Sequence, residues 1–222
     1  MMKCNIVSSS SKGNCIIIND CLMLDCGVSY KKIKDCLKDI KIIFISHEHH
    51  DHLNPTTIKK IAYEKPNIKF IVGEYLIPEL MQLGVGKANI LTFDLNKWYN
   101  IGIFKAKMQH LMHDVPNNCL HIEFKDGEKL FYAVDTNSLE HIQAKDYNLY
   151  LVEGNFEDKE KLEEEIAEKK RNGEFTHLER VLRTHMWQVD SLNWLDKNTG
   201  VGSKYIFIHQ HQEERKNNNE TI

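Results

Sequence analysis

The residues best equipped for chemistry lie in one short segment, where histidines stand at positions 47, 49 and 52 and an aspartate at position 51. Imidazole and carboxylate groups are common ligands for zinc, manganese and iron. In an extended chain His47 and His49 project to the same side, and a turn at His50 would direct Asp51 and His52 toward a second ion. A lone histidine is more often structural, and the alternative here is a solvated histidine-rich loop. The clustering favours a metal site.

The elements that must position this segment begin with the run just before it. Ile42–Ile45 is entirely apolar, which is typical of a strand buried on both faces. Short apolar runs at 5–7, 15–18 and 22–24, separated by polar turns, predict three earlier strands. Apolar spacing further predicts helices over 31–40, 55–64, 76–83, 158–171 and 190–197, and strands over 68–72, 101–108, 120–124, 129–134, 147–152 and 205–208. This order predicts an α/β fold, a sandwich of two mixed β-sheets flanked by helices.

Composition limits the classes of protein to consider. A chain of 222 residues suits one domain, which we expect over 1–212, followed by a polar tail over 213–222. The net charge of −3 does not support a nonspecific nucleic-acid binder. No apolar run approaches the roughly 20 residues of a membrane span, and the N-terminus lacks a signal-peptide core. We therefore expect a cytoplasmic protein without a membrane partner, whose six cysteines are reduced and mostly buried.

The histidine-rich segment resembles a known family. His47, His49, Asp51 and His52 match the HxHxDH motif of the metallo-β-lactamase superfamily letter for letter, directly after a buried strand. The resemblance implies the αββα sandwich of that superfamily and two divalent metal ions. By the same resemblance, His47 and His49 would bind the first ion, and Asp51 and His52 the second. Zinc is the first expectation for both ions, with manganese and iron as alternatives.

The family pattern requires three further ligands, each following a strand. A third histidine for the first ion is His113, with His110 as the alternative. Asp135 would bridge the two ions. The last histidine for the second ion is His209, with His211 as the alternative. Five neutral imidazoles and two carboxylates would leave a site with two divalent ions at about +2, suited to holding a hydroxide and attracting anionic substrates.

Other segments resemble one branch of the superfamily, the YycJ (WalJ) branch. The matching segments, which span nearly the whole chain, are Ser11–Asn14, Leu24–Gly27, His113–Val115, Asp135–Thr136 and Glu153–Asn155. The His-Asp pair of the third segment is the reason for preferring His113 to His110. This branch is associated with cleavage of DNA phosphodiester bonds by a 5′-to-3′ exonuclease.

The resemblance also indicates residues on the substrate side. His185 lies where related phosphodiesterases carry a histidine that is not a ligand, and it could protonate the leaving oxygen. The alternative is a capping or surface histidine before the helix that follows. Ser11, Lys12 and Asn14 could bind a phosphate through hydroxyl and backbone N–H groups, or simply form a polar turn.

Three positions depart from the pattern of the branch. Ser10 replaces a glycine, and Trp187 and His211 each replace a serine. These changes affect the substrate side more than the ligands. We therefore expect a dinuclear metal-dependent hydrolase that cleaves phosphodiesters, DNA before RNA, with a metal-bridging hydroxide oriented by Asp51 and with His185 as the proton donor. The alternatives are hydrolysis of another ester, lactone or thioester, iron-based redox chemistry, and a metal-loaded nucleic-acid- or nucleotide-binding protein without turnover.

Overall fold

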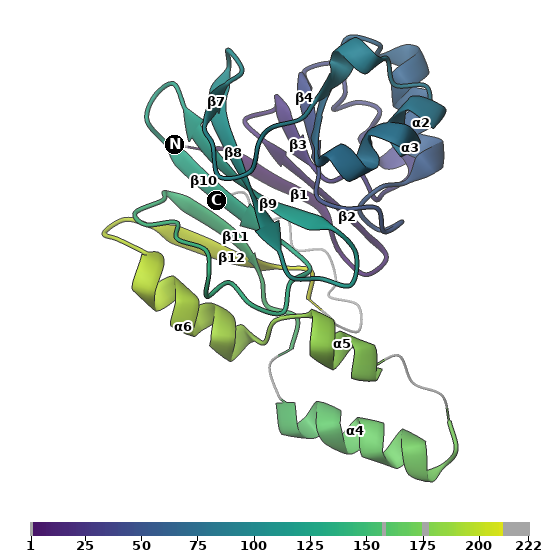
Figure 1. The fold of residues 1–222 in the computed structure, drawn as a ribbon, viewed down its shortest axis with the longest axis vertical. Helices are drawn as coiled ribbons and strands as arrows, with labels where there is room; N and C mark the ends of the chain where they lie inside the picture. The colour runs from purple at the N-terminus through teal and green to yellow at the C-terminus, as the bar shows by residue number, and fades with distance from the viewer. Residues whose placement is uncertain (1, 157–158, 175–177, 211–222) are drawn as a thin grey trace.

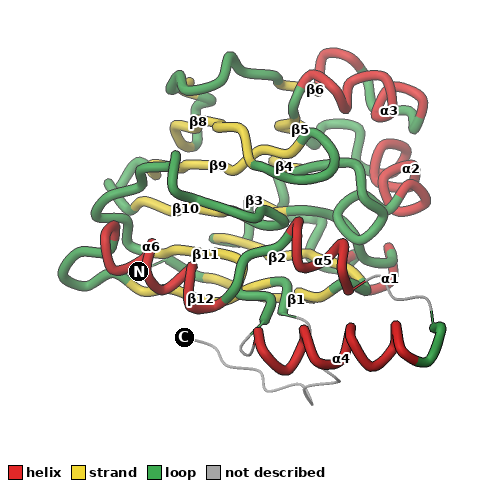
Figure 2. Tube along the Cα trace, turned by 60° about the horizontal axis from the view of Figure 1, so that its bottom comes forward, coloured by secondary structure: helices red, strands yellow, loops and turns green. Residues whose placement is uncertain are grey.

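The protein is built from two β-sheets packed face to face with helices on both outer sides (Figure 1). The computed structural model describes residues 2–156, 159–174 and 178–210. Figure 2 shows the same layers in a second view. The expected α/β sandwich of two mixed sheets is confirmed. The expected polar tail at 213–222 lies outside the described residues.

The first sheet contains six strands in the order of the sequence. They are β1 (Cys4–Ser10), β2 (Gly13–Ile18), β3 (Leu22–Leu24), β4 (Ile42–Ile45), β5 (Lys69–Val72) and β6 (Ile90–Leu91). The first three strands pair antiparallel through short turns, and β3 to β6 pair parallel. Parallel pairing needs crossover connections, and the chain between β3 and β6 supplies them as short helices and turns.

The second sheet also contains six strands, in the order β12-β11-β10-β9-β8-β7. They are β7 (Tyr99–Asn100), β8 (Phe104–Leu111), β9 (Asn117–Phe124), β10 (Lys129–Ala133), β11 (Leu149–Glu153) and β12 (Lys204–Ile208). Strands β7 to β10 pair antiparallel, and β10 to β12 pair parallel. The carboxyl ends of β8, β10, β11 and β12 therefore meet at one edge.

Helices cover the outer faces of the sandwich (Figure 1). The elements beside the first sheet are α1 (Tyr30–Ile33), α2 (Pro55–Glu64), η1 (Glu74–Leu76), α3 (Ile77–Gln82) and η2 (Lys87–Asn89). Helix α6 (Gln188–Asn198) packs on the second sheet. Helix α2 shows why the sequence predicted its start: the Asn54 side chain accepts a hydrogen bond from Thr57 N, and Pro55 occupies the first turn.

The main core lies between the two sheets. Leu24 and Phe44 of the first sheet belong to one buried cluster with Met108, Leu120 and Tyr132 of the second. Because strand side chains alternate between faces, the intervening residues pack outward, against α2 and α3 on one side and α6 on the other. Both sheets are thus buried on two faces, which explains the unbroken apolar run at Ile42–Ile45.

Two helices between β11 and α6 form a separate pair. Helix α4 (Lys159–Arg171) and helix α5 (Leu178–Thr184) share a small apolar cluster that also includes Phe156. Figure 1 shows α4 extending beyond the sandwich, while α5 lies closer to the sheets. The sequence predicted α4 but not α5.

Two other details differ from the expectations. The helix predicted over 31–40 ends at Ile33, and residues 34–39 continue as turns that still bury Leu37. A periodic apolar pattern is satisfied equally by such turns, because it reports burial rather than the backbone bond pattern. The strands β6 and β7 have two residues each, too few to give a pattern. Among the described residues, no helix has the length and apolar character needed to cross a bilayer.

Candidate metal centre

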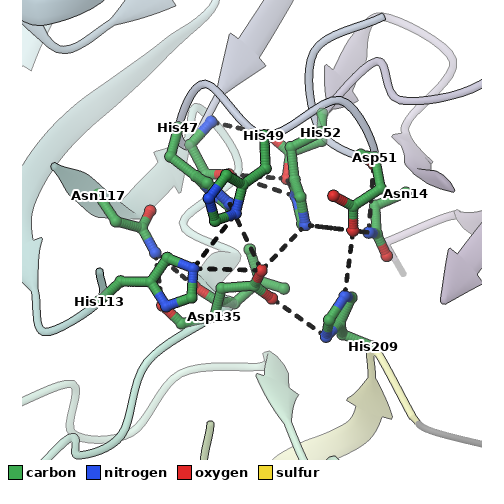
Figure 3. A network of polar contacts seen from close by, with 12 residues as sticks. Asn14, His47, His49, Asp51, His52, His113, Asn117, Asp135 and His209 are labelled. Carbon is green, nitrogen blue, oxygen red and sulfur yellow. Dashed lines mark hydrogen bonds and ion pairs between the residues drawn. The ribbon is translucent and has the colours of Figure 1, made fainter. Parts of the chain in front are cut away.

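Loops at the ends of strands from both sheets bring the predicted ligands together (Figure 3). The loop after β4 carries four of them, and the others follow β8, β10 and β12. The carboxyl ends of β4, β8, β10 and β12 thus lie close together, as expected for a site on loops that a rigid frame holds in place. The seven residues are His47, His49, Asp51, His52, His113, Asp135 and His209.

The first cluster consists of His47, His49, His113 and Asp135. His49 Nδ1 lies 3.1 Å from His47 Nε2 and 3.4 Å from His113 Nε2. Asp135 Oδ2 lies 3.4 Å from His47 Nε2 and 3.7 Å from His113 Nε2. Bonds of about 2.0–2.2 Å to a tetrahedral zinc ion place its ligand atoms about 3.4 Å apart. The spacing of this cluster fits one such ion.

The second cluster consists of Asp51, His52, Asp135 and His209. His52 Nε2 lies 3.2 Å from Asp51 Oδ2 and 3.3 Å from Asp135 Oδ2. His209 Nε2 lies 3.3 Å from Asp51 Oδ2, and its Nδ1 lies 3.1 Å from Asp135 Oδ1. Asp135 belongs to both clusters: its Oδ2 atom lies near Nε2 of His47 and His113 in the first and near Nε2 of His52 in the second. Asp135 is therefore the residue that could contact ions in both clusters.

Hydrogen bonds at the far ring nitrogens orient three of the histidines. His47 Nδ1 lies 2.9 Å from Ser46 Oγ, and His113 Nδ1 lies 3.3 Å from the Thr184 carbonyl oxygen. His52 Nδ1 lies 2.6 Å from Asp25 Oδ2. A neutral imidazole that donates through Nδ1 presents its Nε2 lone pair. Each of these three rings therefore presents Nε2 to the clusters.

Asp25 is a site residue that the ligand pattern did not reveal. It is fully buried, and besides His52 it accepts hydrogen bonds from Ser46 N at 2.8 Å and from the Tyr132 hydroxyl at 2.6 Å. Tyr132 belongs to β10, so this carboxylate connects the two sheets beneath the clusters. A charged residue inside the apolar segment Leu22–Val28 was the available signal.

Glu153 is a second such residue, buried at the end of β11. Its carboxylate accepts a hydrogen bond from Thr136 N at 2.9 Å and lies 2.5 Å from His185 Nδ1 and 3.3 Å from His209 Nδ1. Glu153, His185, His209 and Asp135 form a third group with metal-ligand spacing. The structure thus places His185 beside the second cluster, with its ring stacked on that of His209 at 5.3 Å between centroids.

The local backbone is constrained where the site is formed. Asp25, Asp135 and His209 have positive φ values of 57°, 51° and 52°, a region where aspartate and histidine are tolerated but uncommon. A Cβ atom on Gly27 would lie 1.7 Å from the Asp51 carbonyl oxygen. Only glycine permits the loop of Asp51 to pack this closely, which gives a physical reason for glycine at position 27.

The buried carboxylates of the site favour positive charge nearby, and the pKa values of the histidines show this. Burial lowers the pKa of His47, and it lowers that of His113 to about 4. Burial acts in the same direction on His52 and His209, but Asp135 with neighbouring carboxylates outweighs it. The pKa of His52 is raised well above its usual value and that of His209 to about 10. Cations could supply this positive charge in place of protons.

The donor set fits divalent cations. Asp135 Oδ1 is a buried carboxylate oxygen that accepts no hydrogen bond among the described residues, although His209 Nδ1 lies 3.1 Å away. A buried carboxylate oxygen without hydrogen bonds is costly unless a cation compensates it. The imidazole nitrogens and carboxylate oxygens suit zinc, manganese or iron. The clusters are therefore able to bind metal ions.

The remaining residues singled out in the sequence lie as follows. Asn14 is buried, and its amide nitrogen lies 3.2 Å from Asp51 Oδ2 and 3.0 Å from His52 Nε2, whereas Ser11 and Lys12 are exposed at the β1–β2 turn. His110 is exposed on β8, outside both clusters. His211 lies outside the described residues.

Comparisons with known proteins agree with the two-sheet fold. Residues 22–210 match the family model described as "Beta-lactamase superfamily domain". The fold is similar to the metallo-beta-lactamase fold protein YhfI from Bacillus subtilis, with a TM-score of 0.72 and 15% identity over 96% of this chain and 88% of that one. It is also similar to the short form of human tRNase Z, with a TM-score of 0.69 and 14% identity over 96% and 93% of the two chains.

A different similarity covers a shorter stretch. The cytidine monophosphate-N-acetylneuraminic acid hydroxylases of Mus musculus and Sus scrofa are each 33% identical over 100 residues, or 42% of this chain. The match covers 17% and 22% of their lengths, so the chain spans a small part of these relatives. Taken with the two-sheet fold and the HxHxDH loop, the family model shows that the chain belongs to the metallo-β-lactamase fold superfamily.

Proposed function

We propose that the protein is a dinuclear metal-dependent phosphodiesterase that acts on nucleic acid, on DNA before RNA, with 5′-to-3′ exonucleolytic cleavage as the specific mode. The observation that carries the proposal is the position of Asp135 Oδ2, 3.4 Å from His47 Nε2 and 3.3 Å from His52 Nε2. One carboxylate oxygen shared by two ligand clusters would keep two ions close together, as two-metal hydrolysis uses them.

The first cluster would hold one divalent ion and the second cluster the other, with Asp135 between them. Two such ions, zinc before manganese or iron, would lower the pKa of bound water and neutralise charge on a phosphoryl group. The likeness to the tRNase Z fold supports a nucleic-acid substrate, and the sequence resemblance to the YycJ branch supports DNA.

The residues of the chain itself would divide the remaining work. Asp51 lies at the opening of the second cluster, with 22% of its side chain exposed, and would orient the attacking water. His185 keeps Nδ1 against Glu153 at 2.5 Å, which leaves Nε2 to carry a proton toward the leaving oxygen. The Asn14 side chain donates a hydrogen bond to the Asp51 carboxylate and so helps to position it. Ser11 and Lys12, at the exposed β1–β2 turn, would bind the substrate.

A matched pair of histidine variants tests the assignment. His49→Ala removes a ligand and should abolish hydrolysis of bis(p-nitrophenyl) phosphate, whereas His110→Ala changes an exposed histidine outside the clusters and should leave it intact. Full activity of His49→Ala would refute the metal assignment.

The substrate class needs a second comparison with the wild-type protein. Labelled single- and double-stranded DNA and RNA should be cleaved, DNA faster than RNA, in the presence of Zn²⁺ or Mn²⁺. Hydrolysis of a lactone or thioester but no phosphodiester would contradict the proposal, and so would tight DNA binding without cleavage. Metal analysis of the same samples would identify an iron-loaded redox protein.

A further inference from the structure

We infer that Arg180, supplied by helix α5, is an anion-binding residue at the mouth of the metal centre, where it holds a non-bridging phosphate oxygen of the substrate. This inference deepens the proposed phosphodiesterase function and rests on it. It concerns a residue that is neither a ligand nor part of the proton-transfer pair.

The position of Arg180 is set by the apolar side of its helix. Leu178 of α5 is buried against Leu162 and Ile166 of α4 and Phe156. Val181 and Leu182, three and four residues after Leu178 on the same helix face, pack against this cluster, so Arg180 lies off the apolar face. The Thr184 hydroxyl donates a hydrogen bond to the Arg180 carbonyl oxygen one turn earlier. The carbonyl oxygen of Thr184 in turn lies 3.3 Å from His113 Nδ1. The end of α5 therefore abuts the first cluster.

The guanidinium group reaches that cluster directly. It forms an ion pair with Asp114 and places Nη2 3.4 Å from His49 Nε2. His49 faces the cluster through Nδ1, so its Nε2 points outward, toward the mouth. Asp114 Oδ1 lies 3.5 Å from the same His49 Nε2, and Oδ2 pairs with Arg180. One carboxylate thus holds the arginine beside a metal ligand.

Within the described part of the chain, the guanidinium contacts Asp114 and His49 through Nη2, which leaves its other donors for a ligand. A guanidinium has five N–H donors in a planar fork, and Asp114 takes up only part of them. The side chain of Arg180 is 56% exposed, against 26% for His49 and 28% for Asp114. The walls of the site are buried, so Arg180 marks the side that opens to solvent. An arginine fork matches the paired oxygens of a phosphate group.

The alternative is that the Arg180–Asp114 pair only fastens α5 to the sandwich. Exposed ion pairs contribute little to stability, and Asn137 also fastens the helix through a 3.2 Å hydrogen bond to the Arg183 carbonyl oxygen. A purely structural role would therefore leave affinity for anions unchanged, whereas a binding role would leave folding and metal content unchanged.

The experiment compares Arg180→Ala and Arg180→Lys with Arg183→Ala, which removes an exposed arginine from the same helix. Binding of inorganic phosphate to the metal-loaded proteins is measured by calorimetry, with metal content and thermal midpoint measured on the same samples. We expect phosphate to bind about tenfold to a hundredfold more weakly to Arg180→Ala, as for loss of a hydrogen bond to a charged group. Arg180→Lys should recover part of the affinity, and Arg183→Ala should match the wild type.

Kinetics with bis(p-nitrophenyl) phosphate provide the second readout, in which Arg180→Ala should raise KM far more than it lowers kcat. Phosphate affinity equal to that of the wild type would overturn the inference, and so would loss of metal or of folding in Arg180→Ala. A wild-type protein that binds phosphate through Arg180 but cleaves no phosphodiester would contradict the proposed function alone.

Discussion

The two clusters share Asp135 but differ in the charge around them. The first contains three histidines, and burial lowers the pKa of His47 and His113. The second contains Asp51 in addition, and buried Asp25 and Glu153 lie directly behind its histidines. The first cluster has Asp114 beside it, 3.0 Å from His113 Nε2, but Arg180 pairs with that carboxylate. The two sites thus differ in the carboxylate charge around them, and we expect a cation to be held more strongly in the second.

A histidine elsewhere in the protein shows that carboxylates, rather than burial, make this difference. His121 is as fully buried as His52, but its Nδ1 contacts the Tyr147 hydroxyl at 2.9 Å instead of a carboxylate. Burial, with a contribution from Lys107, lowers the pKa of His121 to about 3. The pKa of His52 moves in the opposite direction because of Asp135 and Asp25.

The largest effect is expected from Asp135→Asn, because this change weakens both clusters together. Loss of residues behind metal ligands alone costs about 10- to 100-fold in affinity, so loss of a shared ligand should exceed that for each ion. Metal content after dialysis, measured by mass spectrometry, checks the result. Retention of both ions would show that Asp135 does not connect the clusters.

Removing one histidine from each cluster should separate their affinities. His113→Ala should lose the first ion and keep the second, whereas His209→Ala should weaken the second ion and leave the first cluster's ligands in place. Carboxylates surround the second cluster. The second ion, which remains bound in His113→Ala, should therefore bind more tightly than the first ion, which remains bound in His209→Ala. Equal affinities, measured by competition with a chelator, would contradict the comparison.

A smaller effect confined to the second cluster is expected from Asp25→Asn. This change removes the charge that orients His52 at 2.6 Å, and we expect about 10- to 100-fold weaker binding of the second ion. Binding in the first cluster should be unchanged, as titration with Zn²⁺ can show. The thermal midpoint of the ion-free variant serves as the control for folding, since Asp25 also bonds Tyr132.

The smallest effect concerns stability in acid, through His121. Its pKa is about 3 in the folded state against 6.5 as an ordinary value, so below 6.5 the unfolded chain binds a proton that the folded chain does not. The free energy of unfolding should therefore fall by about 1 kcal/mol between pH 6 and pH 5 through this residue. His121→Gln should lose that part of the slope in urea titrations, and an identical slope would contradict the assigned pKa.

Much of this organisation could be predicted from the sequence because it depends on neighbouring residues. The loop from His47 to His52 follows its strand directly, and the strands before Asp135 and His209 carry clear apolar patterns. Local patterns thus indicated the ligand loop and the two-sheet fold, and the family resemblance indicated His113, Asp135 and His209 as the further candidate ligands.

The contacts of the supporting residues could not be predicted, even where the family resemblance marked their segments, because their partners lie far along the chain. Asp25 in the first sheet bonds Tyr132 in the second. Glu153 contacts His185, from which it is separated in the sequence by α4 and α5. Arg180 contacts His49 from a helix of seven residues. The polar turn predicts Asn14 as a substrate-binding residue, and the packing against Gly27 and the Asp51 loop adds a contact with Asp51 that the turn does not reveal.

The convergence of residues 47 to 209 on two cations is tested most directly by anomalous diffraction from crystals loaded with Zn²⁺ or Mn²⁺. The expected result is a pair of peaks about 3.5–4 Å apart, one within each cluster and with Asp135 between them. A loaded crystal that shows no peak at these residues, or a metal bound only elsewhere, would contradict the account.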